Sequence, residues 1–384
     1  MKINDKKKIL ELCLYSAGID GVFARVKHEA KLLSEKGYNV RIFSSNIEKG
    51  SNKIVSKDDK IGNVLIKRFS TRKMPFSESY MVWDRGAFER AVVDFKPDII
   101  IAHSYRHSHT HLGLDIAKKI HAKCFLVTHA PFGSDENRSL AARYYVKFFD
   151  RFIGRRRLRE FTKIIAITNW EREFLHNLMV PLDKIAYIPN GIPSDFFSKK
   201  KKTKEQNKIL FLGRISPVKD IETLISAMPL LHDKKIKLEI VGMAEKEYLQ
   251  HINEIIRENK IGKRVSISPA IFDIEGKIKK IDSAKIFVLP SKREGMPQSL
   301  VEAMARGKIV VASEIAGNKE LVDNGKNGFL FNQGDSLDCA RVIDRVLLMR
   351  KKNISLVEKN ARNHVLRFDW KNIVAKIEKV INSD

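Results

Sequence analysis

Cysteine is scarce in this chain, and its N-terminal region has no long hydrophobic run. The three cysteines, Cys13, Cys124 and Cys339, are odd in number and lie far apart in apolar surroundings. This pattern excludes a disulfide framework and indicates reduced residues of the core. The apolar run from Ile9 to Leu14 is too short for a signal-peptide core or a membrane span. We therefore expect a cytoplasmic protein.

Acidic residues are also in deficit. The chain has 72 Lys and Arg residues against 46 Asp and Glu residues, a formal net charge of +26. Such a charge attracts nucleotides, nucleic acid or an anionic membrane surface, and it does not choose among them. The length of 384 residues exceeds a single typical core, and the hydrophobic content of 43% is enough to fill two.

Short apolar runs alternate with helical segments, which predicts an α/β protein with two doubly wound parallel sheets. A turn at Pro189 and a charged stretch that ends at Thr203 indicate a linker, with the domain boundary near Ser198. Residues 369–381 have the spacing of an amphipathic helix. The expected strands are residues 9–14, 40–44, 99–103, 124–128, 164–167 and 185–188 in the first half, and 209–212, 238–241, 265–267, 286–289 and 309–312 in the second.

The most informative segment runs from Glu294 to Glu302 and follows the apolar run 286–290. Pro297 can occupy the first turn of a helix, and Gly307 can cap its other end. Glu294 would then lie in a strand-to-helix loop, and Glu302 about a turn and a half inside the helix. An isolated pair of glutamates at this spacing would be read as ordinary solvated side chains, so the interpretation depends on context.

The start of this helix suits a sugar nucleotide. The N–H groups of Gln298 and Ser299 are orphan donors in a favourable dipole for a diphosphate. A carboxylate such as Glu302 can accept from both hydroxyls of a ribose, and Glu294 can accept from a sugar hydroxyl across the phosphate.

A second segment is ready for phosphate. The apolar strand 209–212 ends at Gly213 and is followed by Arg214 and Lys219. Arginine supplies a planar fork and lysine a mobile point charge, a pair that suits a pyrophosphate whose charge grows as the bond to the sugar breaks. Alone, this loop would be read as a solvated basic loop.

Together these segments resemble the retaining GT-B glycosyltransferases, in particular glycosyltransferase family 4. The family usually has glycine after the lysine, where this chain has Asp220, a residue that also suits a helix N-cap. The matching pieces are Gly213-Arg214 with Lys219, residues 224–227, residues 294–307, Val310 to Ser313, Gly317 to Val322, and Asn327 to Leu330.

The resemblance implies a GT-B fold, with two Rossmann-like domains and a central cleft. Residues 1–198 would form the acceptor-side domain, 199–365 the nucleotide-sugar domain, and 366–384 a helix that crosses back to the first domain. It implies transfer with retention and no metal requirement, consistent with the absence of an Asp-x-Asp motif.

The resemblance also assigns roles to residues of the second half. Arg214 and Lys219 would bind the donor diphosphate, Glu302 the ribose, and Glu294 the transferred sugar. Gly295, Met296, Pro297, Gln298 and Ser299 would close on sugar and phosphate through backbone groups.

Two positions of the first half have weaker signals. His129 follows the expected strand 124–128 and resembles the histidine that contacts the donor sugar in the family; capping a loop is its alternative role. Gly18 and Gly21 lie in the first βα turn, where Gly21 best matches the last glycine of the family's glycine-rich loop. A tight turn would also explain both glycines.

Histidines gather between His103 and His111. Paired histidines can share a metal, but no carboxylate or cysteine stands at a suggestive spacing. We favour polar residues of a βα loop that faces the cleft, and we expect no metal and no cofactor.

The segment from Ala142 to Arg159 mixes large aromatic and aliphatic side chains with a run of arginines. It could lie on an anionic membrane and bring the enzyme to a lipid-linked acceptor. Equally, it could be an amphipathic helix that buries Tyr145, Phe148, Phe149 and Phe152.

The sequence therefore predicts a glycosyltransferase that moves a sugar from a nucleoside-diphosphate sugar to a glycan or lipid-linked acceptor, in cell-envelope polysaccharide or glycoconjugate synthesis. It would work in the cytoplasm, with the inner face of the membrane as a peripheral location. A nucleotide-sugar epimerase on the same scaffold and a non-catalytic binding protein for anionic lipid or nucleic acid are the alternatives. Nucleic acid is the less expected partner, because no RNA-binding signature is present.

Overall fold

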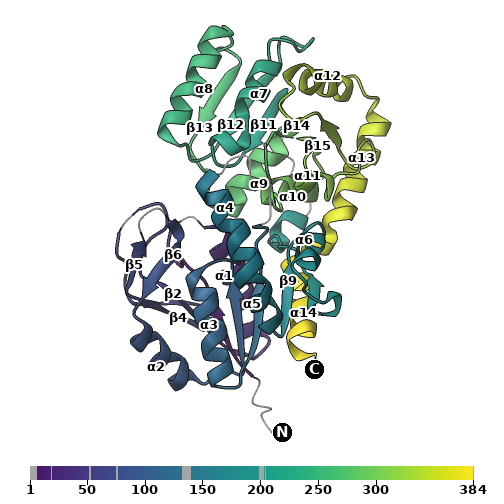
Figure 1. Ribbon diagram of the computed structural model, residues 1–384. Coiled ribbons are helices and arrows are strands. Elements are labelled where there is room, and N and C mark those ends of the chain that lie inside the picture. The colour runs from purple at the N-terminus through teal and green to yellow at the C-terminus, as the bar shows by residue number, and fades with distance from the viewer. Residues whose placement is uncertain are drawn as a thin grey trace. The chain divides into compact units, whose positions relative to one another are not determined.

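The computed structural model describes residues 7–383 except 19, 52, 75–76, 132–139, 199–202 and 204 (Figure 1). The chain divides into two compact units. One contains Met1–Gly191 and Trp370–Asp384, and the other Ile192–Asp369. The division lies a few residues before Ser198, because Ile192 and Phe196 are buried in the core of the second unit. The predicted lysine-rich linker at 199–202 lies outside the described residues.

The first unit is built on an eight-stranded sheet in the order β10-β9-β8-β7-β1-β2-β4-β3. All neighbouring strands are parallel except β3 and β4. The strands are β1 (Lys8–Leu12), β2 (Asn39–Ser45), β3 (Asp58–Ile61), β4 (Val64–Phe69), β7 (Ile99–His103), β8 (Lys123–Val127), β9 (Lys163–Ala166) and β10 (Ile185–Tyr187), and a separate hairpin pairs β5 (Thr71–Met74) with β6 (Ser77–Trp83).

The helices of this unit are α1 (Gly21–Glu35), α2 (Arg85–Phe95), α3 (Ser108–Lys119), α4 (Leu140–Phe148), the π-helix η2 (Phe149–Gly154), α5 (Arg155–Glu160), α6 (Glu171–Asn177) and the C-terminal α14 (Trp370–Asn382), with a 3-10 turn, η3, at Leu182–Lys184. Central strands such as β7, Ile-Ile-Ile-Ala-His, are buried along their whole length. Parallel strands covered on both faces read as continuous apolar runs, which is why the sequence signal was clear.

The strand order reverses between β1 and β7. From β1 the chain adds β2 on one side, and it later returns to add β7, β8, β9 and β10 on the other. Loops that leave the carboxyl ends of strands on either side of such a switch point diverge, and the crevice between them is where open α/β sheets bind ligands. The loops after β1 and β7 therefore mark the functional edge of this unit.

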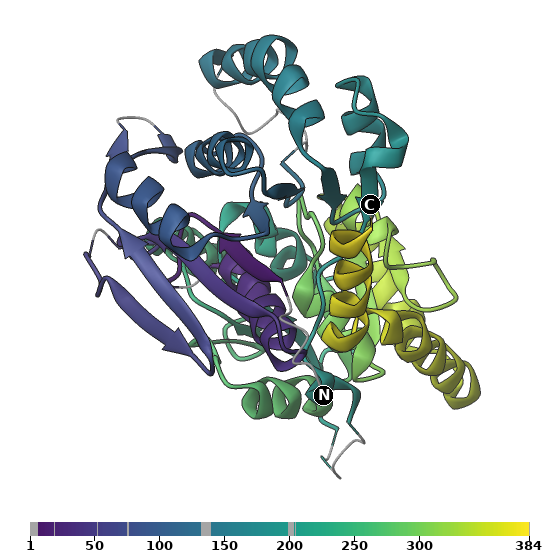
Figure 2. The same cartoon turned by 90° about the horizontal axis from the view of Figure 1, so that it is seen from below.

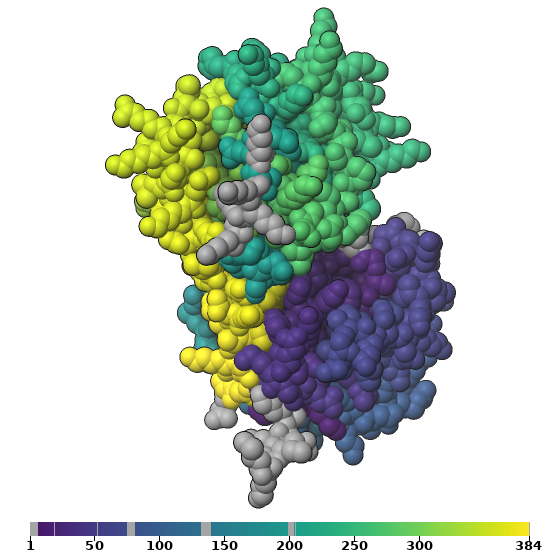
Figure 3. Space-filling view, turned by 180° about the vertical axis from the view of Figure 1, so that it is seen from behind, coloured from purple at the N-terminus to yellow at the C-terminus, as the bar shows by residue number. Residues whose placement is uncertain are grey.

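The C-terminal helix α14 completes the core of the first unit. Its apolar face, spaced at three and four residues, is buried at Trp370, Ile373, Val374, Ile377 and Ile381. It packs along α1, where Glu378 accepts hydrogen bonds from Lys36 and Tyr38 at 2.6 and 3.0 Å. Figures 2 and 3 show this helix in yellow, and in Figure 3 its atoms lie directly against the purple atoms of the N-terminal segment.

The second unit holds a six-stranded parallel sheet in the order β13-β12-β11-β14-β15-β16. Its switch point lies between β11 and β14. The strands are β11 (Lys208–Leu212), β12 (Lys237–Val241), β13 (Val265–Ser268), β14 (Ile286–Leu289), β15 (Ile309–Ser313) and β16 (Phe329–Phe331). The helices are α7 (Ile221–Ala227), α8 (Lys246–Glu258), α9 (Ile274–Ser283), α10 (Gln298–Ala305), α11 (Ala316–Lys319), α12 (Ser336–Leu347) and α13 (Lys351–Val365), with 3-10 turns at Ser194–Phe197, Pro217–Lys219 and Leu366–Phe368.

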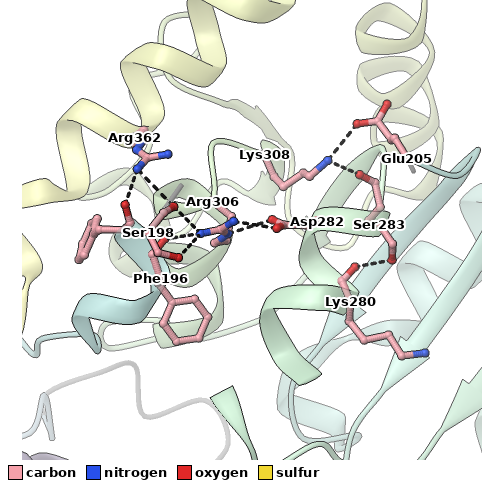
Figure 4. A network of polar contacts seen from close by, with 11 residues as sticks. Phe196, Ser198, Glu205, Lys280, Asp282, Ser283, Arg306, Lys308 and Arg362 are labelled. Carbon is pink, nitrogen blue, oxygen red and sulfur yellow. Dashed lines mark hydrogen bonds and ion pairs between the residues drawn. The ribbon is translucent and has the colours of Figure 1, made fainter. Parts of the chain in front are cut away.

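A buried polar network fastens the chain's entry into this unit (Figure 4). Arg306, fully buried at the end of α10, makes a two-pronged ion pair with Asp282, at 2.9 and 2.7 Å. It also donates to the carbonyls of Phe196 and Ser198 at 3.1 and 2.8 Å. A bidentate guanidinium satisfies more acceptors than any other side chain could at this point.

All eleven expected strands are confirmed, with ends shifted by at most two residues. The strands β3 to β6 and β16 were not expected. No helix of the described residues combines the length and the apolar character needed to cross a membrane.

Candidate active site

The loop after β14 meets the loop after β11 at the switch point of the second unit. Nζ of Lys219, at the end of the 3-10 turn, lies 2.5 Å from Oε1 of Glu294. The same carboxylate oxygen accepts from the hydroxyl of Ser291 at 2.6 Å. Both charged side chains are mostly buried. Two residues that are far apart in the sequence are thus held as one charged unit at the edge where ligands bind.

A glycine packs closely against the backbone of this loop. Gly317, in the short helix α11, sits so close to the loop that a Cβ would lie 2.4 Å from the carbonyl oxygen of Glu294 and 2.6 Å from that of Gly295. Only glycine permits such an approach between two backbones. Gly317 is one of the residues that carry the family resemblance, and the structure gives it a role, which is to allow this close approach of two backbones.

The helix α10 begins one residue later than expected. Pro297 is its N-cap, in an extended conformation, and Gln298 is its first residue. Because its backbone is extended, Pro297 belongs to the loop after β14 and not to the first turn of the helix. Gly307 follows the helix with a φ of +60° and donates its N–H to Met304 at 2.8 Å, as expected of a C-terminal glycine. Gly295, Met296, Gln298 and Ser299 are half-buried, so the loop and the helix start are accessible, while Pro297 is buried.

Glu302 is the fifth residue of α10, in its second turn, and is buried. Its Oε1 lies 3.6 Å from Nζ of Lys277 on α9. Burial raises the pKa of this carboxyl, and Lys277 opposes the shift. A carboxylate held in place beside one lysine retains lone pairs for further hydroxyl donors.

Arg214 is more exposed than the other charged residues of the site. Its side chain is 64% exposed, and its nearest carboxylate oxygen, on Glu245, is 3.9 Å away. An exposed pair at this distance contributes little, so the guanidinium can turn to an anionic ligand at small cost. The structure places Arg214 and Lys219 on the same loop but assigns the contact with Glu294 to Lys219 alone.

Asp220 does not cap α7 in the expected way. Its side chain makes no capping bond to the helix backbone, and its φ of +50° is left-handed. Instead its carboxylate accepts from the hydroxyl of Thr223 at 2.9 Å and lies 3.5 Å from Nζ of Lys292. The left-handed backbone explains why glycine is usual at this position and why aspartate, which tolerates that conformation, can replace it.

In the first unit, His129 lies two residues past the end of β8 and has a left-handed backbone, with a φ of +60°, as does Ala130 with a φ of +52°. Two consecutive left-handed residues need support. The buried Glu171 supplies it by accepting from the N–H of Ala130 at 2.9 Å and from those of Ile167 and Thr168 at 2.8 and 3.0 Å. The position of the His129 ring is therefore built into the fold.

The imidazole of His129 is bonded to a second histidine. Its Nε2 lies 3.0 Å from Nδ1 of His103, the last residue of β7, whose Nε2 lies 2.7 Å from Oε2 of Glu11 on β1. Glu11 and His103 are fully buried. Sequence reasoning missed Glu11, although a carboxylate inside the buried run Ile9 to Leu14 is an anomaly that could have marked it.

A buried ion pair on α1 adjoins this chain. Nε of Arg25 lies 3.1 Å from Oε2 of Glu29, and its Nη1 donates to Oδ1 of Asn190 at 2.9 Å. Among the described residues, Glu11, Glu29 and His103 form the one close group of side chains whose types could ligate a metal. A guanidinium already bonded to this grouping disfavours a further cation.

The remaining histidines of this stretch are packed into the fold, a correction to their expected place in a polar loop. His107 is the N-cap of α3 and His109 lies on that helix, fully buried, where its Nε2 is 2.7 Å from the carbonyl oxygen of His103. Burial lowers the pKa of His107 and His111 to about 4, so both are neutral near pH 7.

The two glycines of the first turn have different reasons to be there. A Cβ on Gly18, whose φ is +80°, would lie 2.6 Å from the carbonyl oxygen of Lys49, so the fold requires glycine. Gly21 is the first residue of α1, and a Cβ there would meet nothing within 4 Å. The fold does not require glycine at 21, and open space lies beside it.

The aromatic segment is largely solvent-facing. Of the two alternatives for this segment, the helix that buries all four aromatic rings is wrong, because Phe149 is buried but Tyr145, Phe148 and Phe152 are exposed. Asp150 anchors the segment to Arg106 at 2.5 Å, and this anchoring leaves the opposite face of the helix uncovered.

Both halves of the chain match models of known glycosyltransferase families. Residues 19–196 match the model of Glycosyltransferase Family 4, and residues 194–364 match that of Glycosyl transferases group 1. The chain belongs to the GT-B glycosyltransferases. An uncharacterized glycosyltransferase of Methanocaldococcus jannaschii is 26% identical over 95% of both chains. A UDP-Gal:alpha-D-GlcNAc-diphosphoundecaprenol alpha-1,3-galactosyltransferase of Escherichia coli is 26% identical over 74% of both.

Solved structures share the fold of this glycosyltransferase. Sucrose-phosphate synthase from Thermosynechococcus elongatus superposes with a TM-score of 0.76 at 17% identity, over 98% of both chains. An Anabaena protein in complex with UDP and glucose superposes with a TM-score of 0.75 at 19% identity, over 98% of this chain and all of that one.

Proposed function

We propose that this glycosyltransferase moves a hexosyl group, with retention, from a nucleoside-diphosphate sugar to a glycan or lipid-linked acceptor. The observation that carries the proposal is the Lys219–Glu294 pair at the switch point, next to the start of α10. It joins a cation for phosphate and a carboxylate for sugar hydroxyls within one contact. The similar Escherichia coli enzyme is named for a diphosphoundecaprenol-linked acceptor, and the similar Anabaena protein is in complex with UDP and glucose, which supports the two substrate classes.

The residues of the second unit divide the donor between them. Lys219 and Arg214 neutralise the diphosphate as it departs, assisted by the N–H groups of Gln298 and Ser299. Glu302 accepts from the ribose, and Glu294 accepts from a hydroxyl of the transferred sugar.

Two groups of the first unit are also proposed to recognise the transferred sugar. His129 offers a neutral ring nitrogen to a sugar hydroxyl. Gly21 permits close approach through its open space. Because Arg214 and Lys219 supply positive charge at the diphosphate, the proposal includes neither a metal nor a cofactor.

The acceptor would be met at the inner face of a membrane, in the assembly of a cell-envelope polysaccharide or glycoconjugate. Tyr144, Phe148 and Phe152 lie four residues apart, as one stripe of exposed rings, and the rings of Phe148 and Phe152 are 4.8 Å apart. The next stripe carries the exposed cations Lys147 and Arg151. Apolar rings beside cations suit an anionic lipid interface.

The donor is tested by thermal unfolding of the protein with UDP-, GDP-, ADP- and dTDP-sugars. We expect one nucleotide class to raise the midpoint, and Lys219→Ala to abolish that rise. Lys326→Ala, which removes an exposed lysine of the same unit, is the matched control. No rise with any nucleotide would refute the donor site.

Transfer is tested with the donor so identified and with short glycan and polyprenyl-diphosphate acceptors. Nuclear magnetic resonance of the product should show the anomeric configuration of the donor, and an inverted product would overturn retention. Conversion of the donor sugar with no acceptor present would instead identify an epimerase.

Membrane binding is tested by co-sedimentation with vesicles of phosphatidylcholine alone or mixed with phosphatidylglycerol. We expect binding to the mixed vesicles, and its loss in the double variant Phe148→Ser, Phe152→Ser. Leu348→Ser removes an exposed apolar side chain elsewhere and should change nothing. Equal binding by both variants would exclude the aromatic stripe as the contact.

A further inference from the structure

Three strands that are neighbours in the first sheet, β1, β7 and β8, carry a continuous hydrogen-bonded chain of side chains. It runs from Oε2 of Glu11 to Nε2 of His103 over 2.7 Å, and from Nδ1 of His103 to Nε2 of His129 over 3.0 Å. Among the residues that the structure describes, Nδ1 of His129 has no hydrogen-bond partner. The chain therefore has a buried end at Glu11 and an available end at His129.

In each of these two hydrogen bonds, either atom can be the donor. A neutral imidazole has one nitrogen that donates and one that accepts, so the role of one ring nitrogen determines the role of the other. Burial lowers the pKa of His103 to about 4 and that of His129 well below its ordinary value, so both rings are neutral at physiological pH. The direction is consequently decided at Glu11, whose carboxyl can donate or accept.

We propose that Glu11, His103 and His129 form a proton relay, in which the protonation state of Glu11 sets whether Nδ1 of His129 donates or accepts a hydrogen bond. With Glu11 protonated, its O–H donates to Nε2 of His103, Nδ1–H of His103 donates to Nε2 of His129, and His129 presents Nδ1–H. With Glu11 ionised, every bond reverses, and Nδ1 of His129 presents a lone pair.

The proton count of the two states differs by one. When Nδ1 of His129 gives up its proton, the proton on Nδ1 of His103 passes to Nε2 of His129, and the proton of Glu11 passes to Nε2 of His103. The negative charge finally rests on Glu11. His129 can thus exchange a proton without becoming an imidazolium, a form that desolvation of its half-buried ring disfavours.

The surroundings of Glu11 allow its carboxyl to be either protonated or ionised near neutral pH. Burial raises its pKa to about 8, and the guanidinium of Arg25 on α1 opposes the shift. Among the described residues, the relay also interacts with Glu29 on the same helix, Asp20 before it, Cys13 after β1, and His107 and His109 at α3. Glu29 bonds Arg25 and is not part of the chain.

Glu11 and His103 are therefore positioning residues for His129. A sugar hydroxyl can donate or accept, so the relay selects which of its hydrogen-bonding modes His129 meets. This last step rests on the proposed function. The relay itself does not, because it exists in the free protein.

The experiment measures the histidine tautomers of the free protein. Protein labelled with nitrogen-15 at histidine is studied by long-range proton–nitrogen correlation spectra from about pH 6 to about pH 9.5, a range that brackets the neutral and slightly basic titrations. His129→Gln and His103→Gln identify the two resonance sets. We expect the proton of His129 to reside on Nδ1 below pH about 8 and on Nε2 above it.

Two variants and one internal reference make the result decisive. Glu11→Gln cannot ionise, so the tautomer of His129 should no longer change with pH, whereas Glu29→Gln should keep the change. His109 should remain an Nε2–H tautomer throughout, because its partner, the carbonyl of His103, only accepts. A wild-type His129 that keeps one tautomer, or a switch that survives Glu11→Gln, overturns the relay. If Glu11→Gln does not fold, the wild-type titration and Glu29→Gln decide.

Discussion

Nζ of Lys219 lies 2.5 Å from Oε1 of Glu294, and the two residues come from loops on opposite sides of the switch point of the second sheet. Burying an ion pair costs free energy unless further hydrogen bonds or a ligand satisfy the two charged groups. In the proposed donor site, the pair would hold Glu294 in place until a diphosphate competes for the lysine. Under this proposal, the diphosphate would meet a lysine that is already in position.

We expect Lys219→Ala to lower kcat/KM by about a hundredfold to a thousandfold, since removal of one electrostatic donor to a developing anion costs about 3–4 kcal/mol. Glu294 would keep only Ser291 of its two described partners. Steady-state kinetics with the identified donor measures the loss. Lys219→Arg should recover part of the activity because it restores the charge. A variant within twofold of wild type would remove Lys219 from the diphosphate site.

Glu302 should act on donor affinity more than on turnover. Because Glu302→Gln removes a charged acceptor for the ribose, we expect the Kd for the nucleoside diphosphate to rise about tenfold or more, or at least about 1.4 kcal/mol. Burial raises the pKa of Glu302, so protonation on acidification should weaken wild-type binding in the same direction. Calorimetric titration at several pH values measures both effects. Affinity independent of pH in wild type would argue against an ionised Glu302 at the ribose.

Gly317 offers a test of the loop that carries Glu294. A Cβ at this position would lie 2.4 Å from the carbonyl oxygen of Glu294, so Gly317→Ala should displace the loop at a cost of about 1–3 kcal/mol and lower activity sharply. The control is Gly262→Ala, where a Cβ would meet nothing within 4 Å. Denaturation midpoints and kcat/KM of both variants are the measurements. Equal behaviour of the two variants would show that the close approach is not needed.

Much of the fold was predictable because its central strands are buried on both faces and read as apolar runs. The unexpected strand β4 alternates instead, with Val64, Ile66 and Arg68 turned inward. Arg68 is buried there because its guanidinium bonds Asp59 and Ser16. A charged residue on the inward face hid the period of two that marks a half-buried strand.

The candidate site was also predictable from the sequence only in part. Lys219, Glu294 and Glu302 could be chosen because each lies in a local motif at a strand end. The chain from Glu11 to His129 could not, because it depends on the order of β8, β7 and β1 in the sheet. That order follows from the crossovers of the whole unit, and no short stretch of sequence contains it.

The buried carboxyl of Glu11 should also leave its mark on stability. Its pKa is raised from an ordinary value of 4.5 to about 8 by burial, so the folded protein holds a proton that the unfolded chain releases in this interval. Since Glu11 binds more protons in the folded state, its contribution to the free energy of unfolding should fall as pH rises from about 4.5 to about 8. Glu29, whose pKa burial raises to about 7, acts in the same direction over a narrower range. The buried histidines His103, His107 and His111, whose pKa burial lowers to about 4, contribute in the opposite direction up to their ordinary pKa of 6.5, so the net fall is expected from about pH 6.5 to about pH 8.

Chemical denaturation at a series of pH values measures this dependence. Glu11→Gln should flatten the part of the slope that reaches about pH 8, and Glu29→Gln only the part that ends near pH 7. Both variants keep a neutral side chain of similar shape, so a difference between them isolates the charge at the buried end of the relay. A slope unchanged by Glu11→Gln would mean that Glu11 is already ionised in the folded protein, and His129 would then present a lone pair at every pH of this range.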